Sequence, residues 1–143
     1  MAIHQLSVFV ENRKGRLAGI TAALAAAKVD IRAVSIADTT DYGILRLIVN
    51  QPGRAMEALK AQGMTVSLTE VIGIAVSDQP GGLAKAVGVL AAAGMDVEYM
   101  YAFVNPGEDV AYVILRVEDN QKATEVLTAG GIRVVSGGEV ERM

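Results

Sequence analysis

Apolar residues change their spacing several times along the first half of the chain. In 4–10 they alternate with polar residues, with Leu6, Val8 and Val10 on one side, and a period of two is typical of a strand. In 15–28 they recur at helical spacing among many alanines, which predicts a helix. By the same reasoning we expect strands at 29–37, 43–50 and 64–71, a turn at 38–42, and a second helix at 54–63. The predicted order is therefore β-α-β-β-α-β.

The second half of the chain repeats this pattern. An offset of 66 residues places Gly15 on Gly81 and Asp30 on Asp96, and an insertion of two residues around 105–108 then changes the offset to 68. The predicted elements of this half are strands at about 71–77, 95–104, 110–118 and 132–136, and helices at 82–93 and about 121–129. Repetition of this kind indicates two divergent copies of one fold.

The order of elements within each copy is that of the ferredoxin-like split βαβ motif. The predicted fold class is α+β, with four antiparallel strands and two helices on one face in each unit. No linker separates the copies, so we expect one unit at 1–70 and a second at 71–143. Units of about 70 residues bury too little surface to be stable alone, which predicts that the two dock on each other.

Composition and charge restrict the classes of function that the protein could have. The chain of 143 residues is 52% hydrophobic, enough for a packed core, and it has no cysteine and a single histidine, His4. The net charge of −3 gives no reason to expect nucleic-acid binding. Residues 1–71 carry eight Lys/Arg and six Asp/Glu (+2), whereas 72–143 carry five and ten (−5). No apolar stretch reaches the ~20 residues of a membrane span and no signal peptide is visible, so we expect a cytoplasmic protein without membrane contact.

Two similar corners precede the first helix of each copy, "ENRKGRLAGIT" at 11–21 and "SDQPGGLAKAV" at 77–87. A helix start exposes unpaired backbone N–H groups and the positive end of the helix dipole, where a small anion or carboxylate can bind. Gly81 and Gly82 would let a ligand approach the backbone, and Asp78 would either cap the helix or accept from an ammonium group. The same residues are also ordinary capping and turn chemistry, so both readings stay open.

The first corner carries more positive charge. Arg13, Lys14 and Arg16 are unfavourable beside a helix N-terminus. They belong either to a solvated loop or to a site that attracts a carboxylate or an acidic partner. Asp30 and Asp96 each precede the second strand of their unit, where they are either turn residues or ligand contacts.

These segments resemble the ACT domain, the small-molecule regulatory module of amino-acid metabolism. Its pattern is an Asn/Asp-x-Pro-Gly-x-Leu corner, an amphipathic helix, and Gly-hydrophobic-Asn/Asp-Ile leading into the second strand. The matching residues are Asn12, Gly15, Leu17, Asp30 and Ile31 in the first copy and Asp78, Pro80, Gly81, Leu83, Gly94, Asp96 and Val97 in the second. The first copy departs at Lys14, where the family usually has Pro, and at Lys28, where Gly is common. The resemblance covers practically the whole chain and implies a tandem ACT protein.

In ACT domains that bind amino acids, the site typically lies where two modules meet. The implied ligand-binding residues are Asn12, Arg13, Gly15, Arg16, Leu17 and Asp30 in the first unit, and Asp78, Pro80, Gly81, Gly82, Leu83 and Asp96 in the second. An aspartate accepts hydrogen bonds without donating them, so it suits the ammonium group of the ligand, while backbone N–H groups would take the carboxylate. Both corners remain candidates.

Little in the sequence predicts catalysis. There is no cysteine nucleophile, no His-x-x-x-His pair, no carboxylate cluster and no nucleotide-binding motif, so we expect no enzyme activity, cofactor or metal site. The resemblance implies a regulatory protein that binds a free amino acid, and a homodimer is the expected assembly. The alternative is a regulatory subunit or interaction module that pairs with an enzyme of amino-acid metabolism and has no ligand of its own.

Overall fold

The computed structural model describes residues 2–11, 13–38, 41–104 and 109–143. Asn12 and the insertion around 105–108 lie outside the described residues. The first unit comprises β1 (Ile3–Glu11), α1 (Arg16–Ala26), β2 (Ile31–Asp38), β3 (Tyr42–Val49), α2 (Pro52–Ala61) and the start of β4 (Thr65–Ser77). The rest of β4 and α3 (Gly82–Ala92), β5 (Tyr99–Ala102), β6 (Val110–Arg116), α4 (Asn120–Ala129), β7 (Arg133–Val135) and α5 (Gly137–Arg142) belong to the second. The predicted class, α+β with two βαββαβ units, is confirmed.

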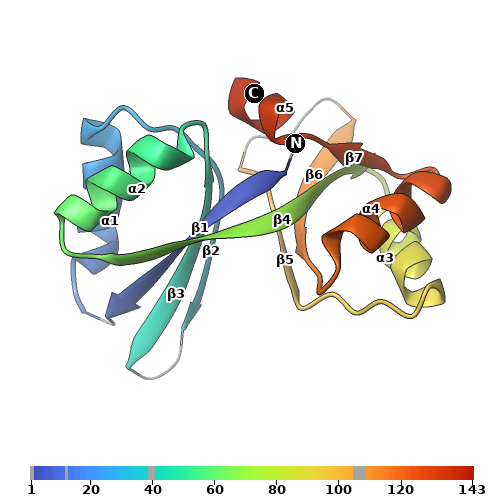
Figure 1. Cartoon of the computed structure of the whole chain (residues 1–143), viewed down its shortest axis with the longest axis horizontal. Helices are drawn as coiled ribbons and strands as arrows, with labels where there is room; N and C mark the ends of the chain where they lie inside the picture. Colours follow the sequence, from blue (N-terminus) through green and yellow to red (C-terminus); the bar gives the residue numbers. More distant parts are fainter. Residues whose placement is uncertain (1, 12, 39–40, 105–108) are drawn as a thin grey trace.

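One strand, β4, belongs to both units. It is 13 residues long and runs from the left-hand unit to the right-hand unit in Figure 1. Residues 65–71 pair with β1, and residues 72–77 pair with β6, both antiparallel. The strand order is β2-β3-β1-β4-β6-β5, with β7 also paired to β4. The two strands expected at 64–71 and 71–77 are therefore a single strand, because the extended backbone continues through Val71 without a turn.

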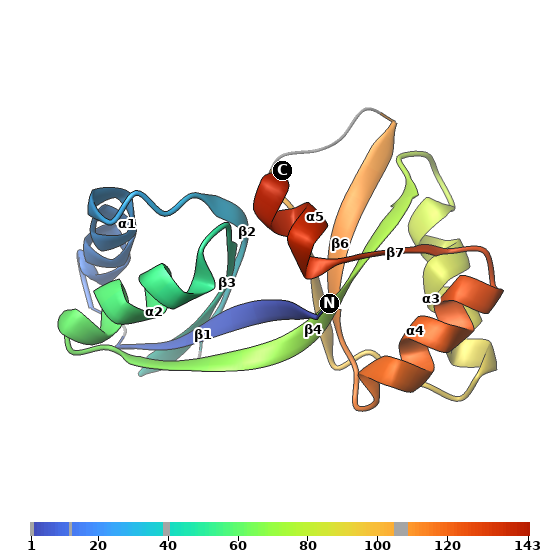
Figure 2. The ribbon, with the colours of Figure 1, turned by 45° about the horizontal axis from the view of Figure 1, so that its top comes forward.

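The two ends of the chain meet along β4. Val71 is the partner of Ile3 at the start of β1, and Gly73 is the partner of Val135 at the end of β7. The strands β1 and β7 thus lie end to end. The helix α5 comes directly after β7 in the chain and lies between the two units in Figure 2. Sequence reasoning did not predict α5, although Ser136 and Glu139 form a capping box at its start, a signal that is visible in the sequence.

Three buried clusters form the core. The helices α1 and α2 cover one face of the first unit's sheet, and α3 and α4 cover the corresponding face of the second unit. The third cluster lies between the units, where the opposite faces of the two half-sheets meet. Its buried members are Ile3, Ala33, Ile48, Val71, Phe103, Ile114, Val135 and Val140. The predicted docking of the two units is confirmed by this shared core.

A polar cluster borders the shared core. Gln5 of β1 is fully buried, and its side chain donates to the hydroxyl of Tyr99 at 2.8 Å and accepts from the hydroxyl of Tyr101 at 2.6 Å. The guanidinium of Arg46 lies over the ring of Tyr99, 3.7 Å from its centroid. Gln5 and Arg46 belong to the first unit, and both tyrosines belong to β5 of the second. These contacts therefore join the two units through directional interactions.

Replacing Tyr101 by Phe is expected to lower the free energy of unfolding by about 1–3 kcal/mol, because the buried acceptor of Gln5 loses its donor. Burial, and then the neighbouring Tyr99, raise the pKa of Tyr101 above its ordinary value of 10.0. The folded protein therefore holds this proton more tightly than the unfolded chain, and the stability that it contributes is complete below about pH 10 and is lost at higher pH. Urea unfolding of the wild type and of Tyr101→Phe at several pH values checks this assignment. The difference between their free energies of unfolding should become smaller above pH 10. A difference that stays constant would contradict the assignment.

Candidate functional site

The second corner connects the end of β4 at Ser77 to α3. Gly81 precedes α3 with a φ of +92°, in the left-handed region that favours glycine. No side chain among the described residues caps this helix, so Asp78 does not act as its cap. The backbone N–H of Asp78 donates to the carbonyl of Asp109 at 3.0 Å. The N–H groups in the first turn of α3 therefore have no side-chain acceptor in the described part of the chain and can receive a carboxylate.

Gly82, the first residue of α3, is required by the path of the chain itself. A Cβ at this position would lie 2.0 Å from the carbonyl oxygen of Ser77. Pro80, Gly81 and Leu83 around it are exposed. The close approach expected at this corner is thus made between two segments of the backbone, and a ligand contact at Gly82 stays a prediction.

The first corner has the same backbone form. Gly15 precedes α1 with a φ of +79°, and none of the described side chains caps the helix. The guanidinium of Arg13 is 2.6 Å from the carboxylate of Glu11, which neutralises one of the three expected cations. Arg16 is half-buried, and its Nε is buried without a hydrogen-bond partner among the described residues. This corner therefore retains an unpaired donor beside a helix start.

Asp30 lies at the opposite end of α1 from the corner. The helix has 11 residues, which corresponds to a length of about 16 Å. The carboxylate of Asp30 contacts the guanidinium of Arg32. Arg32 also donates to the backbone carbonyls of Val140 at 3.2 Å and Glu141 at 3.0 Å, so it holds α5 against the first unit. Asp30 thus orients a residue that links the C-terminal helix to β2.

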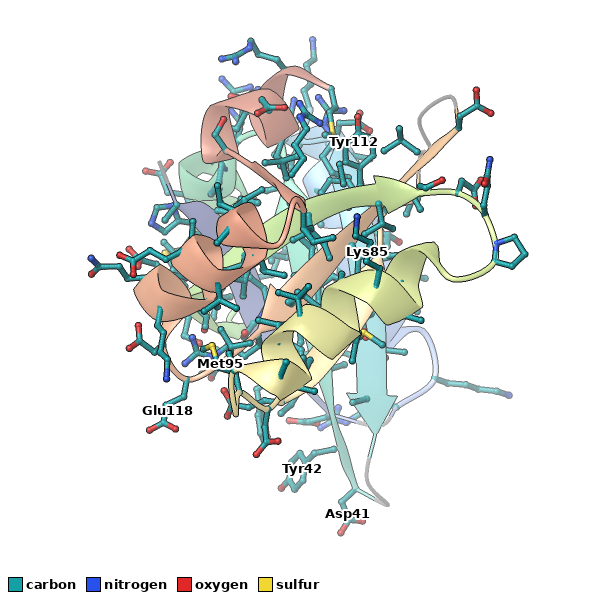
Figure 3. The ribbon with its side chains drawn as sticks, turned by 90° about the vertical axis from the view of Figure 1, so that its right-hand side faces the viewer. Asp41, Tyr42, Lys85, Met95, Tyr112 and Glu118 are labelled. Carbon is teal, nitrogen blue, oxygen red and sulfur yellow. The ribbon has the colours of Figure 1, made fainter. Side chains whose placement is uncertain are left out.

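Asp96 has the equivalent position after α3, and it is exposed. It lines a hollow of about 910 Å³ between the C-terminal end of α3 and the start of α4. Figure 3 shows α3 and α4 side by side and labels Met95 and Glu118, which also line this hollow. Asp96 makes no ion pair within the described ranges. The structure does not bring the corner and the aspartate of one unit together, because the length of the helix separates them.

Each unit also presents an exposed apolar face, which combines a predicted site residue on a helix, Leu17 or Leu83, with a strand residue that was not predicted. Leu17 of α1 and Val34 of the adjacent β2 are 44% and 42% exposed. At an offset of 66 their counterparts are Leu83 and Met100, which are 37% and 45% exposed. The exposure of Val34 and Met100 depends on their position in the end strands of the sheet, which no local pattern shows. The two faces are candidates for contact with another ACT unit.

The fold and the paired corners define the class of protein. The chain belongs to the ACT family, since the model of an ACT domain pair matches residues 1–143. A solved structure of a protein from Bacteroides thetaiotaomicron is similar with a TM-score of 0.93 and 39% identity, over 100% of this chain and 98% of that one. The regulatory subunit of aspartate kinase from Thermus thermophilus shares the fold, with a TM-score of 0.67 and 18% identity over 91% and 93% of the two chains. No curated protein matches this sequence.

Two further features bear on the predicted functions. Across the part of the chain that the structure describes, no group of three or more His, Cys, Asp or Glu side chains is placed to hold a metal ion. None of the helices in the same part is long and apolar enough to cross a membrane.

Proposed function

We propose that this protein is a non-catalytic regulatory protein that binds a free amino acid between two ACT units. The observation that carries the proposal is the pair of helix starts at Gly15 and Gly81, whose first turns are not capped by any side chain that the structure describes. The α-carboxylate of the ligand would accept from these N–H groups, and an aspartate would accept from its ammonium group.

A complete site requires a second unit. The corner and the aspartate lie at opposite ends of one helix, so a neighbouring unit with an antiparallel helix would place its aspartate beside the corner. The exposed faces around Leu17 and Leu83 supply apolar surface for this contact. The substantial helix contacts within the chain join α1 to α2 and α3 to α4, so the antiparallel neighbour would come from a second copy. A homodimer with a two-fold axis would complete the ligand site of both units at once.

Charge favours one combination of corner and aspartate. The first corner has the unpaired Nε of Arg16, whereas Asp30 of the same unit is already paired with Arg32. Asp96 of the second unit has no ion-pair partner among the described residues. A zwitterionic ligand between the first corner of one copy and Asp96 of the other would meet a cation at its carboxylate and an anion at its ammonium group.

Thermal unfolding in the presence of each of the twenty amino acids tests the proposal. One or a few amino acids should raise the melting temperature, because a ligand at one hundred times its Kd stabilises the folded state by about 2.7 kcal/mol. Arg16→Gln and Asp96→Asn should each remove most of this shift. Asp78→Asn is the matched control at the other corner and should retain it. The absence of a shift with every amino acid would exclude the sensor.

The alternative is an interaction module that pairs with an enzyme and has no ligand of its own. Phe9 and Tyr42 favour it, since their side chains are about half exposed and their ring centroids are 5.0 Å apart on the first unit. Aromatic pairs of this kind are common at protein interfaces. The similar structure from Thermus thermophilus is a regulatory subunit of aspartate kinase, which supports a partner of this class. This function would be identified if no amino acid raised the melting temperature of the protein and the protein bound such an enzyme.

A further inference from the structure

The helix α1 differs from α2 and α4 in the surface that it presents to solvent. Between Arg16 and Lys28 the sequence contains no charged residue, and its only polar side chain is that of Thr21. The hydroxyl of Thr21 lies 3.1 Å from the carbonyls of Leu17 and Ala18, so it donates within the helix. The exposed positions of α2 and α4 include the charged residues Arg54, Glu57, Lys60, Lys122 and Glu125. Because exposed helix surfaces are normally polar or charged, the outer surface of α1 is suited to contact with apolar groups.

The edge of the sheet beside the start of α1 is also apolar. Val34 and Ile36 of β2 are the partners of Leu47 and Leu45, which are buried under the helices, so their side chains are on the helix-covered face. They are nevertheless 42% and 53% exposed, because β2 is the end strand of the sheet. The helix and the strand run in opposite directions from the connection at 27–30. Leu17 is about 14 Å from the end of the helix, the length of about four strand residues, so it lies level with Val34 and Ile36.

The apolar group of Leu17, Val34 and Ile36 lies beside the first corner. Leu17 comes directly after Arg16, whose Nε is buried without a hydrogen-bond partner among the described residues. In the proposed function, this guanidinium and the N–H groups of the first turn receive the carboxylate of the ligand. The Cβ of an amino acid is only two bonds from its carboxyl carbon. A carboxylate held at the corner therefore directs the ligand's side chain toward this apolar group.

The second unit of the neighbouring copy adds mainly apolar surface at the same place. The exposed residues in the second half of α3 are Gly88, Ala91 and Ala92. The one charged residue of this helix, Lys85, lies at the opposite end of it from Met95, as Figure 3 shows. The carboxylate of Asp96 is needed for the ammonium group of the ligand. The surfaces left for the ligand's side chain are thus apolar on both sides.

We propose that the ligand of this protein is an amino acid with an apolar side chain, an inference that rests on the proposed function. Its carboxylate and ammonium group contact the first corner and Asp96 of the neighbouring copy, and its side chain contacts Leu17, Val34 and Ile36. A polar or charged side chain would lose its water there without gaining a partner. Each CH₂ group of an apolar side chain would instead leave water and strengthen binding.

Titration calorimetry of the full chain with leucine, asparagine, norleucine and lysine tests the class of the ligand. Leucine and asparagine have side chains of similar shape, as do norleucine and lysine, and the members of each pair differ in their polar or charged atoms. We expect leucine to bind at least about tenfold more tightly than asparagine, and norleucine at least about tenfold more tightly than lysine.

The outcomes of this experiment separate the class of the ligand from the existence of the site. Asparagine or lysine binding as tightly as its apolar counterpart would overturn the apolar class and leave the proposed function intact. A polar amino acid that raised the melting temperature more than every apolar one would do the same. If none of the twenty amino acids bound, the proposed function itself would be contradicted, and the apolar class with it.

Two exposed residues of the first unit provide matched variants. Ile36→Thr reduces the apolar surface beside Leu17 and should weaken leucine binding by about fourfold, the effect of one buried CH₂ group. Leu68→Thr is the control and should leave binding unchanged, since Leu68 is 43% exposed on the same face but lies in β4, on the opposite side of the first unit's sheet. Melting temperatures without ligand show whether both variants are folded. Equal effects of the two substitutions on leucine binding would also overturn the proposal.

Discussion

Replacing Gly73 by Val is expected to lower the free energy of unfolding by about 3 kcal/mol. Gly73 lies in β4 at the junction of the two units. A Cβ there would be 2.6 Å from the Cδ1 of Ile3 and 2.6 Å from the Cγ2 of Val135. Both neighbours are buried in the core that the units share, so neither can move without disturbing it. The two further methyl groups of valine enlarge the clash.

Urea unfolding followed by far-UV circular dichroism measures this effect. Gly88→Ala is the matched control, because nothing lies within 4 Å of a Cβ on this exposed helical glycine. The control should be neutral or stabilise the protein by up to about 1 kcal/mol. Loss of the shared core should also affect both units in one transition. A Gly73→Val variant as stable as Gly88→Ala would show that the junction is loosely packed.

Replacing Gly82 by Ala should also cost about 3 kcal/mol, because the new Cβ would lie 2.0 Å from the carbonyl oxygen of Ser77. This oxygen belongs to the backbone at the end of β4, so the clash can be relieved only if the whole corner moves. Gly81→Ala should cost less, about 1–2 kcal/mol, since it only forces a Cβ into the left-handed region at φ +92°. Urea unfolding of both variants gives the order of the two effects.

Gly19→Ala serves as the control for this pair, since a Cβ there meets nothing within 4 Å and the residue is on an exposed side of α1. It should not destabilise the protein. If Gly82→Ala retained full stability but lost the amino-acid response, the second glycine would be present for the ligand and not for the path of the chain. The matched position in the first unit is Arg16, which has a side chain, so the first corner does not share this constraint.

The regular elements could be predicted because their signals are local. The alternation of Leu6, Val8 and Val10 appears in the structure as three buried residues on one face of β1. Gly15 and Gly81, which the repeat places in register, both have positive φ at a helix start. The helix expected at 82–93 is α3, Gly82–Ala92. Each of these features depends on residues within a few positions of one another.

The arrangement of the candidate site could be predicted only in part. The corners and the two aspartates were found as repeated residues, and the helix predicted at 15–28 already separates Gly15 from Asp30. Asp30 orients Arg32, which contacts α5, and this helix comes more than 100 residues later in the chain. A groove of about 930 Å³ along α4 likewise combines residues from both ends of the chain, among them Ile3 and Val135.

Periodicity and repetition are therefore sufficient to establish two βαββαβ units and to locate the paired corners, since a strand, a helix and a left-handed glycine are set by their neighbours in the chain. Only the tertiary structure shows that β4 serves both units, that Gln5 joins them through two tyrosines, and that Arg32 holds α5 against the first unit. These features depend on which surfaces of the sheet can be buried against each other. That choice is made by packing between distant residues, and no local pattern encodes it.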